Sequence, residues 1–145
     1  MTRKPVGLLA LLLTSAALLS AQGPAGYRVV VNAANPGASL RKSEVSNLFL
    51  KKTTKWAHGV AVTAVDQSAT SPVRTAFSKQ VHGRAVDSVQ NYWQQQIFSG
   101  RDEPPRVKTS DSEVMAFVQA NAGGIGYVSE KAALIDGVKF LTVTD

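Results

Sequence analysis

The sequence predicts an α/β fold in which short strands and helices alternate along one domain. Residues 27–32 and 138–143 are β-branched and apolar runs of strand length. The segments between such runs carry apolar residues at helical spacing, and several of them begin with a capping residue. Strands interleaved with helices indicate a layered fold, here a mixed sheet of about four to five strands flanked by helices.

The N-terminal residues are predicted to be a signal peptide rather than part of this domain. Arg3 and Lys4 precede the apolar run 6–19, and Ala21 ends a sequence suited to cleavage. A membrane anchor is the alternative, but the apolar run is short for a span of about 20 residues. We therefore expect a signal peptide at 1–21, a single domain at 22–145, a periplasmic or secreted location, and no membrane span after cleavage.

The net charge and the absence of cysteine limit which ligands and which covalent links are expected. The chain has 16 basic and 10 acidic residues, and loss of Arg3 and Lys4 leaves 14 − 10 = +4. A mild positive charge favours anions, but nucleic acid is not expected for an exported chain without aromatic residues among its basic ones. The chain contains no cysteine, which excludes disulfides and lipid attachment through cysteine.

The first half of the domain is predicted as strand, helix and strand. A turn at 35–37 follows the first strand, and Ser43 is expected to cap a short helix that ends with Lys51 and Lys52 in its last turn. A loop at 53–59 and a second strand at 60–65 come next. The apolar positions of the short helix are Val45, Leu48 and Phe49.

Two helices are predicted between residues 71 and 98. Ser71 is expected to cap the first helix, with Pro72 at its first position and Gly83 closing it after His82. The second helix runs from about Ala85 or Asp87 to Phe98. Its apolar stripe comprises Val86, Val89, Tyr92, Trp93 and Ile97, and the aromatic members are expected in the core rather than stacking on a ligand.

A capping box predicts a further helix, and the remaining strands follow it. Ser110 and Glu113 have the spacing of that motif, and the helix is expected to stop at Gly123. Strands are predicted at 125–128 and 138–143, with a turn of helix at 130–134 between them.

The loop between the second strand and the Ser71 helix is the strongest candidate for a binding site. Ser68, Thr70 and Ser71 place three hydroxyls beside free N–H groups and the positive end of a helix dipole, an arrangement that suits a small anion. The same residues also serve simply to cap a helix. Arg74 can fold back to bind the anion or can pair with Asp66, and the sequence leaves both possibilities open.

No catalytic residues, metal ligands or cofactor are predicted. His58, Asp66 and Ser68 are the residue types of a hydrolytic triad, but no nucleophile-elbow motif accompanies them. His82 precedes Gly83 at a helix end, where a histidine is favoured by the dipole alone. The glycines of GGIGY (123–127) follow a helix and enter a strand, so they indicate a tight turn rather than a dinucleotide loop.

Several motifs in order resemble a known family. They are VVVNAANP, NLFLKKTTKW, VDQSATSPVRTAF, YWQQQIFSG, SDSEVMAFV and GGIGYVS. Together they make residues 27–143 similar to the phosphate-type substrate-binding proteins of ABC transporters. The resemblance implies the type II periplasmic-binding-protein fold, but it covers one lobe only, the lobe that carries the family's Ser-Gly-Thr anion loop. In full-length members the anion lies between two lobes.

The resemblance implies an anion site in the same loop, with departures from the family pattern. Ser68 and Thr70 keep both hydroxyls, and Ser71 and Arg74 carry over less directly. Ala69 replaces the glycine that allows close backbone approach, and an apolar residue near Ala64 replaces an upstream arginine. These departures predict weak binding of phosphate or a similar oxyanion, with a transporter or envelope protein as partner. The alternative is a periplasmic interaction module that keeps the fold and has lost ligand binding.

Overall fold

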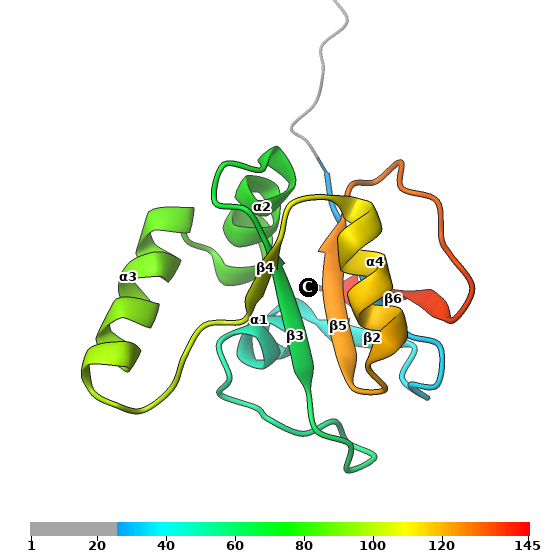
Figure 1. The fold of residues 1–145 in the computed structure, drawn as a ribbon, viewed down its shortest axis with the longest axis horizontal. Helices are drawn as coiled ribbons and strands as arrows, with labels where there is room; N and C mark the ends of the chain where they lie inside the picture. Colours follow the sequence, from blue (N-terminus) through cyan, green and yellow to red (C-terminus); the bar gives the residue numbers. More distant parts are fainter. Residues whose placement is uncertain (1–25) are drawn as a thin grey trace, which may run out of the picture.

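The computed structural model describes residues 26–145, and the predicted signal peptide lies outside this range. A six-stranded mixed sheet forms the centre of the domain, in the order β2-β6-β1-β5-β3-β4 (Figure 1). The central strand β1 is antiparallel to both β5 and β6, whereas β3 is parallel to β4 and β5 and β2 is parallel to β6. The strands are β1 Arg28–Asn32, β2 Ser39–Arg41, β3 Thr63–Gln67, β4 Arg106–Lys108, β5 Gly124–Val128 and β6 Val138–Thr144.

Helices cover both faces of the sheet and make it the middle of three layers. One face packs against α1 (Lys42–Phe49) and α2 (Pro72–Phe77), and the other against α4 (Asp111–Ala120). Alternate residues of β1 therefore enter different cores, with Val29 and Val31 facing α1 and α2, and Val30 facing α4. This confirms the α/β class and explains why the first strand is apolar at every central position.

The two strands that the sequence did not predict are the outer ones. β2 and β4 have three residues each, and neither is buried, so they lack the apolar run that marks an inner strand. The second strand begins at Thr63 rather than Val60 because the N–H groups of Trp56 and Val62 bond to the Val60 and Thr54 carbonyls, closing a separate loop. The expected helical turn at 130–134 is not formed.

The first helix begins one residue earlier than its predicted cap. Ser43 lies inside α1, and Arg41 is the N-cap, because the Glu44 carboxylate accepts a hydrogen bond from the Arg41 N–H at 2.8 Å. The helix ends at Phe49, so Lys51 does not belong to its last turn; its φ of 54° instead places it in the left-handed region. The prediction of the Ser43 cap and of lysines in the last turn was therefore wrong.

The helix after the hydroxyl loop is confirmed at both ends. The Ser71 hydroxyl caps α2 and Pro72 occupies its first turn. The helix continues without a break as a π-helical turn, η1 (Ser78–His82), and Gly83 ends it with a φ of 64°. The combined segment therefore runs from the loop to Gly83, as the sequence predicts.

The helix α3 (Val86–Phe98) has the predicted limits but is buried only along its first part. Val89 and Trp93 pack against Leu50, and the Tyr92 hydroxyl donates to the Leu50 carbonyl at 3.1 Å. Ile97 is 56% exposed, because α3 extends beyond the sheet at the side of the domain (Figure 1). Tyr92 and Trp93 are thus packing residues, as expected, whereas the apolar residue Ile97 in the last turn of α3 is exposed to solvent.

The capping box before α4 is shifted by one residue. The Ser110 hydroxyl accepts from the Glu113 N–H at 3.2 Å, but the Glu113 carboxylate accepts from the N–H and hydroxyl of Thr109. At the other end of α4 the expected tight turn is present: a Cβ on Gly123 would lie 1.8 Å from the Ala61 carbonyl oxygen. Among residues 26–145, no helix is both long and apolar enough to cross a bilayer.

Candidate functional site

The predicted anion loop leaves the end of β3 and enters α2. Backbone bonds hold its ends: the Ser68 N–H donates to the Lys108 carbonyl at 3.1 Å, and the Ser71 N–H donates to the Ser68 carbonyl at 2.9 Å. The first bond ties the loop to β4 and the second closes it into a turn. The positions of the loop hydroxyls therefore depend on the sheet edge as well as on the helix.

Ser68 and Thr70 form the open part of the loop. Their hydroxyl oxygens lie 3.2 Å apart, Thr70 is exposed and Ser68 is half-buried. The N–H groups of Ala69, Thr70 and Val73 have no hydrogen-bond acceptor within the described part of the chain. Two hydroxyls and three free N–H groups on neighbouring residues are the donors that a small oxyanion needs.

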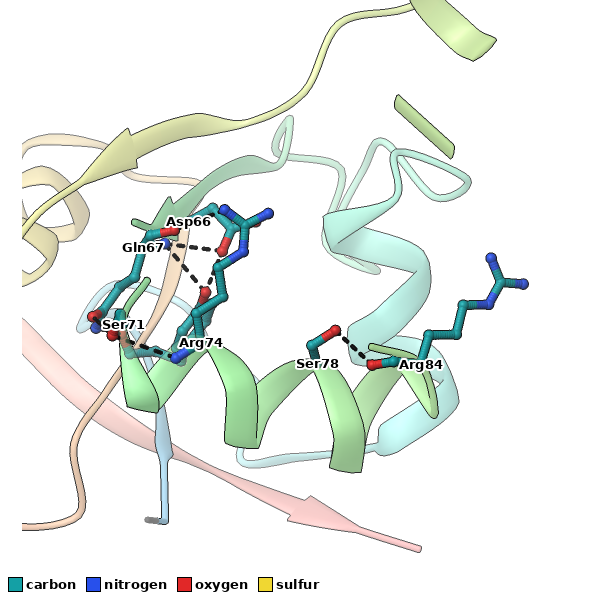
Figure 2. Close-up of polar contacts among 7 residues, drawn as sticks. Asp66, Gln67, Ser71, Arg74, Ser78 and Arg84 are labelled. Atoms are coloured by element: carbon teal, nitrogen blue, oxygen red, sulfur yellow. Dashed lines mark hydrogen bonds and ion pairs between the residues drawn. The ribbon is translucent and has the colours of Figure 1, made fainter. Parts of the chain in front are cut away.

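Ser71 is already committed to the protein. Its hydroxyl donates to the Gln67 side-chain oxygen at 3.0 Å and accepts from the Arg74 N–H at 3.5 Å (Figure 2). Gln67 is 3% exposed, so the serine faces inward rather than toward the open part of the loop. Ser71 therefore orders the helix start, which is the capping alternative that its sequence position allows.

Arg74 also points inward. Its guanidinium donates from Nη1 to the Gln67 carbonyl at 2.9 Å, and Nη2 lies 3.4 Å from an Asp66 carboxylate oxygen (Figure 2). The Arg74 side chain is 9% exposed. Of the two possibilities that the sequence left open, the structure shows the pairing with Asp66. The positive charge lies beneath the loop, and the adjacent carboxylate reduces the attraction that it offers to an anion.

Asp66 is the centre of this buried network. Its carboxylate accepts from the Tyr127 hydroxyl and, at 2.9 Å, from the Gln67 N–H. Burial raises the pKa of the Asp66 carboxyl, and Arg74, Tyr127 and the Gln67 N–H oppose that shift. Burial, and then the neighbouring carboxylate, raise the pKa of Tyr127, so this phenol remains a hydrogen-bond donor at neutral pH.

A second helix start joins the network from the other face of the sheet. The Gln67 amide donates to the Tyr127 carbonyl at 2.9 Å and to Asp111 at 3.1 Å, and Asp111 is the first residue of α4. Asp111 also accepts from the Ser129 hydroxyl at 2.6 Å. Gln67 thus links α2, α4 and β5 through hydrogen bonds, and these bonds hold the buried side of the loop in place.

Sequence reasoning missed Gln67, Tyr127 and Asp111. The polar character of Gln67 predicts a loop position, although it is the last residue of β3, and the predicted strand at 125–128 contains Tyr127 without indicating a role for its hydroxyl. A usable signal was present in the neighbouring polar residues Asp66 and Gln67 directly after an apolar strand. Polar groups in that position must be hydrogen-bonded if they are buried.

The other chemically suggestive residues are not brought together. Asp66 bonds to Tyr127, Ser68 bonds to Thr70, and His58 stacks on Trp56, with no hydrogen bond joining the three within residues 26–145. In the same range, no group of three or more His, Asp or Glu side chains is placed to hold a metal ion.

His82 lies at the helix end before Gly83, as predicted, but its ring contacts a neighbouring helix. Its Nδ1 lies 2.7 Å from the Ser46 hydroxyl, at the contact between η1 and α1. Burial, and then the charges of Arg84, Arg74 and Lys52, lower the pKa of His82 to about 4. The ring is therefore neutral at pH 7 and makes no cationic interaction with the helix dipole, contrary to expectation.

Comparisons with known proteins give matches among solved structures only. A scan against protein families finds none that matches, and a search of curated proteins finds no match either. An ABC-type phosphate transport receptor from Vibrio cholerae aligns with a TM-score of 0.64 and 20% identity over 83% of this chain and 48% of its own.

Two further structures show the same relationship. A putative phosphate ABC transporter substrate-binding protein with bound phosphate from Clostridium perfringens aligns with a TM-score of 0.64 and 20% identity, over 82% of this chain and 45% of its own. A possible phosphate-binding protein from Planctomyces limnophilus aligns with a TM-score of 0.60 and 16% identity, over 83% and 42%. The chain thus spans about half the length of each neighbour, and it has the fold of a single lobe of the phosphate-type ABC-transporter substrate-binding proteins.

Proposed function

We propose that this protein is an exported, single-lobe solute-binding domain that binds phosphate or a similar oxyanion weakly through the loop 68–71. The supporting observation is the open half of this loop, where the Ser68 and Thr70 hydroxyls adjoin three N–H groups without acceptors in residues 26–145. The neighbours are named as phosphate transport or phosphate-binding proteins, which supports the choice of anion. Export rests on the predicted signal peptide at 1–21.

The proposal assigns different roles to the four candidate residues. Ser68 and Thr70 donate to the anion directly. Ser71 holds the helix start through Gln67, and Arg74 supplies a positive charge beneath the loop while it remains paired with Asp66. Binding is weak because the loop is open to water, which competes for each donor. The proposed activity is binding, and no group in the network is assigned a catalytic step.

Calorimetry and NMR with phosphate and sulfate test this function. We expect heat and chemical-shift changes at residues 68–74 at millimolar anion, and their loss in the double variant Ser68→Ala, Thr70→Val. A matched control changes a serine and a threonine that are exposed elsewhere, Ser112→Ala with Thr142→Val. Absence of both heat and shift changes in the unmodified protein at millimolar anion would reject the proposal.

The second candidate function is a periplasmic interaction module without a ligand, and one observation favours it. Ile97 and Phe98 at the end of α3 are 56% and 91% exposed, so two consecutive large apolar side chains face solvent. A transporter or envelope protein is the proposed partner. If the Ser68→Ala, Thr70→Val double variant keeps a purified partner bound while Ile97→Ser with Phe98→Ser releases it, the interaction function is favoured.

A further inference from the structure

A groove adjoins the open loop and is not used by a bare oxyanion. It has a volume of about 480 Å³ and is lined by Ala69, Thr75, Lys79 and residues 83–87. Thr75, Lys79 and Gly83 succeed one another along one side of the α2–η1 segment, and Ala69 connects the groove with Ser68 and Thr70. Its volume is in the range of organic-ligand sites, roughly 300–1,000 Å³, and is much larger than a phosphate ion requires.

Hydrogen bonds fix the wall of the groove opposite α2. The buried Ser78 hydroxyl donates to the Arg84 carbonyl at 2.7 Å (Figure 2), and the Arg84 N–H donates to the Ser78 carbonyl at 3.3 Å. Gly83, in the left-handed region, ends η1, and these two bonds hold the Arg84 backbone against Ser78. The groove is therefore a feature of the folded backbone rather than a chance gap between surface side chains.

The chemistry of the lining suits an organic anion. Ala69, Ala85 and Val86 provide apolar surface, and Thr75 adds a methyl group beside its hydroxyl. Lys79 and Arg84 bring two positive charges against the single negative charge of Asp87. Within residues 26–145 neither cation has a carboxylate partner within 4.0 Å, so both are free to meet an anionic ligand.

We propose that the ligand is a phosphoester, with its phosphoryl group on the Ser68–Thr70 donors and its organic body in the groove beside Lys79 and Arg84. This inference rests on the proposed oxyanion site and specifies the class of its ligand. The organic body removes apolar surface from water when it enters the groove, a source of affinity that inorganic phosphate lacks. Lys79 and Arg84 add positive charge beside the groove, which attracts an anionic ligand to this side of the domain.

The test compares inorganic phosphate, phenyl phosphate and phenol in NMR titrations of the full domain. We expect phenyl phosphate to bind at least about tenfold more tightly than inorganic phosphate, with shift changes at residues 68–70 and at 83–87 together. Lys79→Ala with Arg84→Ala should weaken phenyl phosphate about three- to tenfold. The control variant Lys131→Ala with Arg101→Ala removes two exposed cations outside the groove and should leave binding unchanged.

The possible outcomes separate this inference from the proposed function. If phenyl phosphate matches inorganic phosphate in affinity and shifts only residues 68–70, the phosphoester inference is overturned and the oxyanion site remains. If neither anion shifts residues 68–70, both fail. If phenol shifts the groove as strongly as phenyl phosphate while residues 68–70 stay unchanged, the groove is a separate apolar site and the inference is overturned.

Discussion

Arg74 Nη2 lies 3.4 Å from Asp66 Oδ2, and the two side chains are only 9% and 10% exposed, respectively. The pair lies directly beneath the hydroxyl loop, between the end of β3 and α2. The Asp66 carboxylate also accepts hydrogen bonds from Tyr127 and Gln67, and the Arg74 guanidinium donates to the Gln67 carbonyl. Replacing one member of a buried ion pair leaves the other charge buried without a partner, so such a substitution is expected to lower the free energy of unfolding strongly.

Arg74→Ala should destabilise the domain by about 3–5 kcal/mol, because Asp66 then remains buried without its counter-charge. Urea unfolding followed by circular dichroism measures the effect. Arg101→Ala, which removes an exposed arginine, should change the free energy of unfolding by less than about 0.5 kcal/mol. A loss below about 1 kcal/mol for Arg74→Ala would show that the ion pair is not essential.

Tyr127→Phe should cost about 1–3 kcal/mol, since it removes the phenolic donor to the buried Asp66 carboxylate and leaves that acceptor short of a partner. Tyr92→Phe is a matched change, because the Tyr92 hydroxyl donates to a neutral carbonyl at a partly buried site. We expect about 1 kcal/mol there. Equal losses in the two variants, measured by thermal and urea unfolding, would contradict a special role for the Asp66 contact.

Acidification should destabilise the folded state through His82. Its pKa is about 4 in the fold against an ordinary value of 6.5, so between these values the unfolded chain binds more protons. Stability contributed by the neutral ring is therefore complete above pH 6.5 and is lost as the pH falls toward 4, by up to about 3 kcal/mol.

The raised pKa of Asp66 means that acidification stabilises the fold through this carboxyl, opposite to the effect of His82. The contribution of His82 is therefore measured as the difference in free energy of unfolding between the unmodified protein and a His82 variant. His82→Asn keeps a polar group near Ser46 without a titrating ring, and it should show the smaller loss of stability between pH 7 and 5. An NMR titration of His82 gives the midpoint directly, after His58→Gln assigns the two histidine signals. A midpoint near 6.5 would contradict the buried, neutral ring.

Trp93→Ala should loosen α3 without unfolding the sheet. Val89 and Trp93 carry the buried contact of this helix with Leu50, so the large-to-small change costs about 3–5 kcal/mol locally. Hydrogen exchange should show lost protection in 86–98 and retained protection in β1 and β5. Ile97→Ala, on the exposed end of the same stripe, should leave protection nearly unchanged, and comparable losses in both variants would contradict this division of α3.

Much of the local structure follows from short-range patterns. The limits of α3, the cap at Ser71 with Pro72 behind it, and the turn at Gly83 are all predicted by the sequence, and the structure confirms them. The misplaced features are those that depend on a distant partner. β2 and β4 are too short and too exposed to be recognised without β6 and β3 beside them. The Ser43 cap is the exception, because the contact that moves the cap to Arg41 is made by Glu44, only three residues away.

The candidate site shows the same division. The sequence alone determined that Ser68, Thr70 and Ser71 precede a helix start, because capping is chemistry between residues three or four positions apart. Only the tertiary structure decided that Arg74 turns toward Asp66, and that Tyr127, 61 residues from Asp66, completes the network. Burial is the physical reason: a charge removed from water must find partners among whatever groups the sheet register and helix packing place beside it.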